Sequence, residues 1–443
     1  MCCNKLLNRA LTLALVATLV TACGGGGGGP APAPISVPGT PTLNSLPTIA
    51  AGVKSNELPI HVDAGPADTG YNVNRLYTDV TICHPGKSSP GSATQCQTIN
   101  HVLVDTGSFG LRLLSSAMAP DLNLSRLILN SGSPLLNCAQ FVDNTFTWGP
   151  VALSDVVLGG KTAASVPIQV IADPSFTSPA DTCSVGGTAM TTAKALGANG
   201  ILGIGLFKED CGERCNRIVD NGFYYTCTDT NCNGAKARLD QQVQNPVSRF
   251  LTDNNGVLIN LPAVASPGVP TLNGTLTFGI GTQSPASVTV LIPNSSGHFI
   301  TVLAGQNLPN KFTTSFIDSG SNGLFFDSST ITKCGPSDTG FYCPTSPTTL
   351  LATLVGANAV SSPVLSFPIS IATDLFAGGT NNIRNNVLPT LAGPVTPDSL
   401  VPAIDPVPSS SFDWGLPFFY GRRVFFGIEG QASTLGTGPF YAF

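Results

Sequence analysis

Two segments of the chain pass from an apolar, strand-like run into the same polar ending. They span residues 102–111 and 315–324, and each ends in an acid, a hydroxyl residue, a glycine and a serine. This pattern predicts a β-strand that delivers a carboxylate, Asp105 or Asp318, into a tight turn. A Gly-Leu step and a Ser-Ser pair follow each turn. The repetition indicates an internal duplication that brings two carboxylates to one site.

Composition favours a β-rich fold. Charged residues make up only 10% of the 443-residue chain, which contains 48 Gly and 36 Pro. Many Ser, Thr and Val residues accompany them, a composition that suits short strands joined by turns. The length leaves room for two lobes, each with its own core. The net charge of −5 provides no basic face for nucleic acid.

The N-terminus indicates export. Lys5 and Arg9 precede the apolar run Ala10–Val20, which ends just before Cys23. This resembles a lipoprotein signal peptide, residues 1–22, followed by a lipid-accepting cysteine. About 11 apolar residues are too few for a membrane span, which needs roughly 20.

Residues 23–55 predict a tether. Six glycines, Gly24–Gly29, are followed by a Pro-rich stretch that gives flexibility and then extension. Because Gly24 and not an Asp follows the lipidated cysteine, the sorting rule of Gram-negative lipoproteins indicates the outer membrane, on its periplasmic or surface face.

The two turns resemble those of the pepsin-like aspartic proteases, in which each lobe contributes one Asp-Thr/Ser-Gly turn. Further segments match that family in the same order, so the resemblance covers roughly residues 56 to 443. These segments are Asn199–Gly205, Asn245–Leu251, Gly274–Gly279 and Asp413–Phe419. The nearest relatives we expect are bacterial lipoproteins of an uncharacterised pepsin-like family.

The resemblance implies an all-β, bilobed fold of two pseudo-symmetric, barrel-like lobes with a cleft between them. Residues 56–265 would form the N-terminal lobe, with a Cys-rich insertion at about 207–235, and residues 266–443 the C-terminal lobe. The cleft would hold an extended peptide or protein substrate, and the protein would act as a monomer.

The paired acids predict general acid–base catalysis. Two carboxylates within about 3 Å cannot both ionise cheaply, so Asp105 and Asp318 would share one proton. The ionised acid would activate a water molecule while the protonated one donates to the scissile carbonyl. This chemistry needs neither a metal nor a cofactor.

Six small residues support the predicted acids. Gly107 and Gly320 permit close backbone approach, since a Cβ there would obstruct the turns. The resemblance implies that one hydroxyl from each turn bonds across the lobe interface and another holds an outer carboxylate oxygen. These hydroxyls belong to Thr106 and Ser319, and to Ser108 and Ser321, respectively.

The predicted flap departs from the family pattern. Residues 138–149 predict a hairpin with an Asp-Asn turn and no Tyr. Phe141, Phe146 or Trp148 would supply an aromatic lid, or else pack as in any hairpin. Arg112 lies near the position at which the family usually has another aromatic residue. The family's subsite preferences therefore cannot be transferred to this chain.

Cysteine arithmetic agrees with an oxidising compartment. Of 13 Cys, three lie in the signal or accept lipid (Cys2, Cys3 and Cys23), and the even remainder predicts five disulfides. The four cysteines between residues 211 and 232 also fit a zinc site, although we expect disulfides there. The pairs are Cys83–Cys96, Cys138–Cys183 and Cys334–Cys343, with Cys211, Cys215, Cys227 and Cys232 paired among themselves.

These features predict an envelope-anchored aspartic endopeptidase. The alternatives are an inactive binding protein of the same fold and an envelope structural lipoprotein. The four histidines lack metalloprotease spacing, and no Gly-x-Ser-x-Gly elbow occurs. His101 precedes Asp105 by four residues on the same predicted strand, and we expect it to be a core or edge residue.

Overall fold

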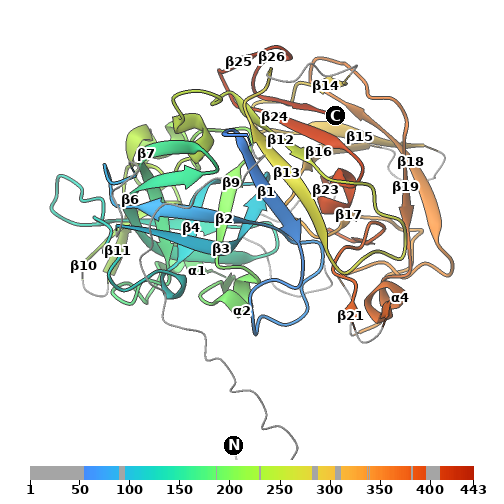
Figure 1. Cartoon of the computed structure of the whole chain (residues 1–443), viewed down its shortest axis with the longest axis horizontal. Coiled ribbons are helices and arrows are strands. Elements are labelled where there is room, and N and C mark those ends of the chain that lie inside the picture. The colour runs from blue at the N-terminus through green and yellow to red at the C-terminus, as the bar shows by residue number, and fades with distance from the viewer. Residues whose placement is uncertain are drawn as a thin grey trace, which may run out of the picture. The chain divides into compact units, whose positions relative to one another are not determined.

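The computed structural model describes residues 54–443, apart from 89–94, 186, 229–230, 282–287, 305–310, 337, 339, 381–382 and 396–409. The predicted signal peptide, Cys23 and all but the end of the predicted tether lie outside these residues. Strands make up 44% of the structure and helices 9%, which confirms the all-β class (Figure 1). Within the described residues, no helix combines the length and apolar character that a membrane span requires.

Sixteen of the described strands form one large sheet, in which β8 (Thr188–Ala189) pairs with β6 beside the main path. The strand order is β11 (Asn231–Gly234), β10 (Tyr224–Thr228), β5 (Leu135–Gln140), β6 (Thr145–Leu158), β7 (Lys161–Ile171), β4 (Phe109–Leu114), β9 (Gly200–Ile204), β3 (Cys96–Asp105), β2 (Leu76–Cys83), β1 (Glu57–Val62), β13 (Leu272–Phe278), β12 (Gly256–Asn260), β24 (Arg423–Gly427), β27 (Phe440–Ala442) and β14 (Val290–Leu291).

A second sheet contains seven of the described strands, and two small ribbons, β20–β21 (Gly379–Thr380, Ile383–Arg384) and β25–β26 (Ala432–Ser433, Gly436–Thr437), complete the strands. Its order is β19 (Leu365–Ile369), β18 (Thr348–Val355), β15 (Phe299–Ala304), β16 (Lys311–Ile317), β23 (Phe412–Trp414), β17 (Leu324–Phe326) and β22 (Ala392–Gly393).

The helical elements are short. The α-helices are α1 (Asp181–Ser184), α2 (Ala193–Leu196), α3 (Glu213–Arg217) and α4 (Ala372–Ala377). The 3-10 helices are η1 (Ser115–Ala117), η2 (Leu239–Gln241), η3 (Pro246–Arg249) and η4 (Leu416–Phe419). Residues 245–251, which matched a family helix, contain only η3.

The same three-strand arrangement surrounds both Asp turns. Strand β9 lies between β3, to which it is parallel, and β4, to which it is antiparallel. Strand β23 lies in the same way between the parallel β16 and the antiparallel β17. Each turn therefore connects the two outer strands of such a unit, and this repeated topology supports an internal duplication.

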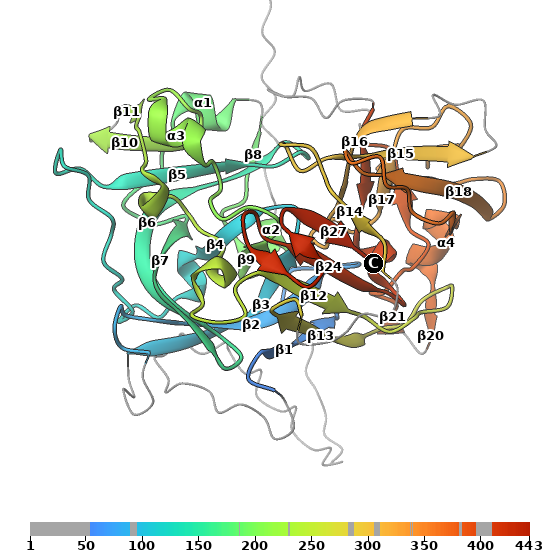
Figure 2. The ribbon, with the colours of Figure 1, turned by 90° about the horizontal axis from the view of Figure 1, so that it is seen from above.

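The large sheet continues across the predicted lobe boundary at residues 265/266. Strands β12 and β13 flank this boundary and pair with each other, while β13 also pairs with β1 and β12 with β24. Figure 2 shows β12, β24 and β27 next to one another between the two turn-bearing units. Backbone hydrogen bonds therefore join strands from both halves of the chain.

Buried and accessible residues alternate along a strand where only one face of the sheet is exposed to solvent. Strand β18 alternates between buried and more accessible residues, whereas β9 is buried throughout because strands and side chains cover both faces. In the second sheet, Phe412 stacks on Trp414 at 4.2 Å and on Phe326 at 4.6 Å between ring centroids. These rings form an aromatic cluster on strands β23 and β17.

The structure joins the cysteines in the three pairs expected from proximity. It resolves the remaining cluster into Cys211–Cys215 and Cys227–Cys232, so all four sulfur atoms are used in disulfides and not in the alternative zinc site. The Cys-rich insertion also extends the large sheet, because Tyr224 of β10 pairs with Asn137 of β5.

Asn74 links the N-terminal half to three distant segments. Its amide nitrogen donates to the carbonyls of Asn322 and Leu388, both at 2.8 Å, and its amide oxygen accepts from Leu388 N–H and the Tyr420 hydroxyl. The side chain is fully buried and the backbone φ is +48°, a conformation that asparagine tolerates better than most residues.

We predict that Asn74→Ala destabilises the protein by about 2–4 kcal/mol, because it leaves several buried polar groups without partners. Chemical denaturation of the disulfide-intact protein measures this change. The exposed Asn123→Ala serves as the control and should stay within about 0.5 kcal/mol of the parent. Equal stability of the two variants would contradict the bridging role of Asn74.

Candidate active site

The structure brings Asp105 and Asp318 together. Gly107 N–H donates to Asp105 Oδ1 at 2.8 Å and to Asp318 Oδ1 at 3.0 Å. Gly320 N–H donates to Asp318 Oδ1 at 2.7 Å, and the two carboxyl groups are themselves hydrogen-bonded. The inner oxygens of both acids therefore meet between the two glycines.

Crossed hydroxyl bonds join the two turns behind the acids. Ser319 N–H donates to Thr106 Oγ1 at 2.9 Å, and Thr106 N–H donates to Ser319 Oγ at 3.2 Å. The same hydroxyls donate to strand carbonyls of the opposite half, Thr106 to Ile317 at 3.3 Å and Ser319 to Val104 at 2.7 Å. Both residues are buried. This is the bonding across the interface that the sequence led us to expect.

The outer carboxylate oxygens are held by serines. Ser108 Oγ donates to Asp105 Oδ2 at 2.5 Å, and Ser321 Oγ donates to Asp318 Oδ2 at 2.8 Å. The two turns thus orient their acids through equivalent residues. Each carboxyl plane is fixed by one hydroxyl and by backbone N–H groups.

The turn glycines are required by proximity. A Cβ on Gly107 would lie 2.5 Å from Asp318 Cγ, and one on Gly320 would lie 2.8 Å from Asp105 Cγ. Neither glycine has a positive φ, so backbone conformation is not the reason for them. The acids approach each other as closely as they do because no side chain separates them.

Solvent reaches the acids from the glycine side. Asp105 and Asp318 are 6% and 9% exposed, while Gly107 is exposed and Gly320 is partly so. The two glycines are therefore more exposed than the acids they accompany.

Burial governs the charge of the pair. It raises the pKa of Asp318 well above its usual range, and the neighbouring carboxylates of Asp105 and Asp413 raise it further. The N–H of Gly320 opposes this rise by stabilising the charged form. Burial and the neighbouring carboxylates therefore favour the protonated form of Asp318.

A third acid, Asp413, lies next to the dyad. It is 5% exposed, and its Oδ1 has no hydrogen-bond partner among the described residues. Burial raises its pKa to about 8, the hydrogen bond with the Ser321 side chain lowers it, and the charge of Asp105 raises it. The charge of Asp413 in turn raises the pKa of Asp318, so the third acid is coupled to the dyad.

Sequence reasoning placed Asp413 in an apolar segment and gave it no role. In the first half, Ile201 lies opposite Leu103, two residues before Asp105; in the second, Asp413 lies opposite Phe316, two residues before Asp318. Alignment of Asp413-Trp414-Gly415 with Ile201-Leu202-Gly203 was the available signal, since it puts a carboxyl where the duplicated unit has isoleucine.

The expected flap hairpin forms from β5 and β6, with Asp143 and Asn144 in its turn. Phe146 and Trp148 are buried against the disulfide-linked part of the sheet, and the Trp148 ring lies 5.4 Å from that of Tyr225. Phe141 is partly buried against a separate apolar cluster. The aromatic candidates are therefore placed as packing residues of the hairpin.

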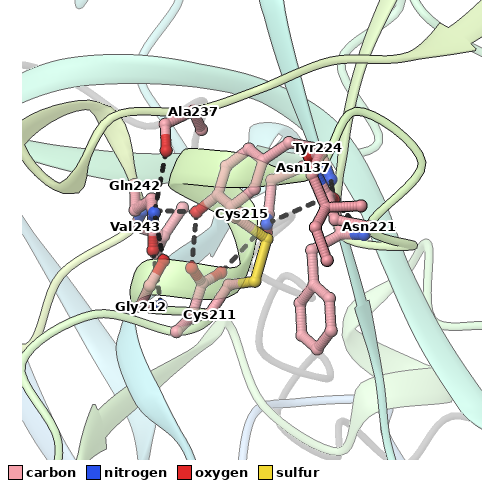
Figure 3. The surroundings of a disulfide bond; sticks show 12 residues. Asn137, Cys211, Gly212, Cys215, Asn221, Tyr224, Ala237, Gln242 and Val243 are labelled. Carbon is pink, nitrogen blue, oxygen red and sulfur yellow. Dashed lines mark hydrogen bonds between the residues drawn. A yellow bond between two sulfur atoms is a disulfide. The ribbon is translucent and has the colours of Figure 1, made fainter.

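Arg112 forms a buried ion pair. Its Nη2 lies 3.0 Å from Asp210 Oδ2, and its Nη1 donates to the carbonyl of Phe109 just after the first turn. Asn137 and Tyr224 also donate to Asp210. Burial raises the pKa of Asp210, and Arg112 is the main group opposing that rise. Figure 3 shows Asn137 and Tyr224 beside the Cys211–Cys215 disulfide.

The chain belongs to a family of proteins of unknown function, DUF3443, whose model matches residues 52–443. The matched region contains both Asp turns, Asp413 and the Cys-rich insertion. A comparison with curated proteins finds no match.

We predict that Arg112→Ala destabilises the protein by about 3–5 kcal/mol, because it leaves the Asp210 carboxylate buried without its cation. Denaturant unfolding with the disulfides intact measures the change. Arg217→Ala is the matched control, since it breaks the exposed pair with Glu213 and should leave stability close to that of the parent. Similar losses for both variants would show that the Arg112 pair is not structurally important.

We predict that Asp413→Asn changes how stability depends on pH. The pKa of Asp413 is raised from 3.8 to about 8, so the folded state holds a proton that the unfolded state releases. The parent should therefore lose stability as pH rises from about 4 to about 8, and Asp413→Asn should lose less. Unfolding free energies across this range measure the difference, with the exposed Asp121→Asn as control. Parallel curves for all three proteins would contradict the assignment.

Proposed function

We propose that the protein is an aspartic endopeptidase with a bilobed, pepsin-like fold. The observation that carries this proposal is the pair of acids, each held by a serine of its own turn and both accepting from the N–H of Gly107. The crossed bonds between Thr106 and Ser319 add a symmetry that a chance meeting of two turns does not require.

The proposed reaction uses water and no covalent intermediate. The ionised acid takes a proton from a water molecule between the carboxyls while the protonated acid donates to the substrate carbonyl. The tetrahedral species then breaks down as a proton passes to the leaving nitrogen. The chain itself supplies both the acid and the base, so the proposal calls for no metal or cofactor.

Two buried acids favour an enzyme over a protein that only binds. Each carboxylate raises the free energy needed to ionise the other. A protein that only binds a peptide does not need such a pair. A peptide carbonyl would approach the acids from the side of the exposed Gly107.

We propose further that Cys23 carries a lipid that anchors the protein to the outer membrane, with the following segment as a tether. The disulfides of the described region agree with an oxidising compartment. Substrates would then be polypeptides outside the inner membrane.

We predict that the lipid-free protein, residues 30–443, cleaves members of a peptide library between about pH 3 and 8. Asp105→Asn and Asp318→Asn should each reduce cleavage by at least about 10²-fold, since each removes an acid or base that the reaction needs. Mass spectrometry of the products measures cleavage. The exposed Asp121→Asn should retain parent activity, and a statine-type inhibitor should block it.

Two outcomes would contradict the proposal. A folded parent that cuts nothing across the whole pH range would favour the binding protein of the same fold. Cleavage that survives both substitutions would show that the activity belongs to another site or to a contaminant.

A further inference from the structure

A second polar cluster lies where β1 and the segment after it approach β3. The ring nitrogens of His61 and His101 and a carboxylate oxygen of Asp63 all lie within 4.8 Å of one another. Asp63 Oδ2 is 3.6 Å from His61 Nε2 and 3.3 Å from His101 Nε2. One carboxylate oxygen therefore faces both imidazoles.

A β-bulge directs His101 into this cluster. Between the pairs Val80–Ile99 and Thr78–Val102, two residues of β3, Asn100 and His101, face the single residue Asp79 of β2. His101 has a φ of +48°, which is uncommon outside glycine. Bulges re-aim side chains and recur next to functional sites.

The bulge is held from the other side by Asn199. Its backbone N–H donates to the carbonyl of His101 at 3.0 Å, and its side-chain amide donates to the carbonyl of Asn100 at 3.0 Å. The unusual backbone of His101 is thus fixed by the surrounding structure. An uncommon φ that is held in this way is a reason to look for a function.

The three side chains are also pre-oriented. Gly65 N–H donates to Asp63 Oδ1 at 2.8 Å, which leaves Oδ2 facing the imidazoles. The His61 and His101 rings pack against the Tyr77 ring at 6.1 and 5.3 Å, and the Tyr77 hydroxyl donates to the carbonyl of Gly197. Such supporting contacts around ligating groups are typical of metal sites.

The distances fit a metal site, and the 3.3 Å contact between His101 Nε2 and Asp63 Oδ2 also lies within hydrogen-bond range. With bonds of about 2.0–2.1 Å, neighbouring ligand atoms of a tetrahedral zinc site lie about 3.3–3.4 Å apart. The observed 3.3 and 3.6 Å are close to that value. A charge-assisted N–H···O bond would be about 2.7–2.9 Å.

We propose that His61, Asp63 and His101 bind a divalent transition-metal ion of the zinc class. Two imidazoles and a carboxylate are ligands that zinc accepts, and three protein ligands leave a further position for water or another group. The side chains are 22–30% exposed, so an ion can enter from solvent. The bound ion would fasten β1 to β3, the strand that ends at Asp105.

The linear sequence hides this site because its ligands come from separate segments joined by sheet pairing. Strand β1 lies beside β2, where His61 pairs with Tyr77, and β2 lies beside the bulged β3. The site is independent of the proposed peptidase activity, since none of its ligands takes part in the dyad.

We predict that the full chain, purified in detergent without a histidine tag and stripped with EDTA, binds one Zn²⁺ in isothermal titration calorimetry. His101→Ala and Asp63→Asn should weaken binding by more than about 100-fold, because loss of even an outer-shell partner costs about 10–100-fold. His84→Ala is the matched control and should bind as the parent does. Excess Mg²⁺, which prefers oxygen ligands, should not compete.

Melting curves recorded in EDTA show whether each variant folds without metal. A loss of Zn²⁺ binding can then be distinguished from a loss of folding. If His101→Ala fails to fold, His61→Ala and Asp63→Asn provide the same test. The proposal is overturned if the parent takes up no Zn²⁺, or if folded His61→Ala and Asp63→Asn bind it as tightly as His84→Ala does.

Discussion

The crossed bonds between Thr106 and Ser319 are the constraint on which the site depends. Each hydroxyl accepts from the opposite turn and donates to the opposite strand, so neither turn can shift without breaking bonds on both sides. The groups are buried, and a broken bond would leave polar atoms without solvent. These bonds hold the carboxyls of Asp105 and Asp318 close together, and they fix the two β-units relative to each other where the acids meet.

Proximity and burial together determine the protonation of the site. Glycines at 107 and 320 let the carboxyls approach each other, and both acids are buried. Asp413 adds a third acid to the same buried region, and its raised pKa keeps it neutral under conditions in which an ordinary aspartate is charged. When Asp413 is ionised, its charge raises the pKa of the catalytic candidate Asp318.

The sequence alone predicted the features that depend on local pattern. Both Asp turns and most of the disulfides follow from residues close together in the chain, and the all-β class follows from composition. What it missed depends on long-range pairing. The position of Asp413 requires the parallel register of β16 and β23, and the partner of Arg112 is almost a hundred residues away. His101 was expected to be a core or edge residue, because the sequence pattern of a strand does not reveal a bulge that redirects one of its side chains.

The disulfide-linked insertion explains why the hairpin aromatics pack as they do. Strand β10 pairs with β5, so the flap hairpin is an inner part of a sheet that ends in β11. Trp148 and Phe146 contribute their surfaces to the contact with this added layer. Opening the hairpin alone would expose that aromatic surface and break the β5–β10 hydrogen bonds, at a cost that a free two-stranded flap does not carry. Any movement that admits a ligand to the acids must therefore carry the insertion with the hairpin, or must occur in other segments.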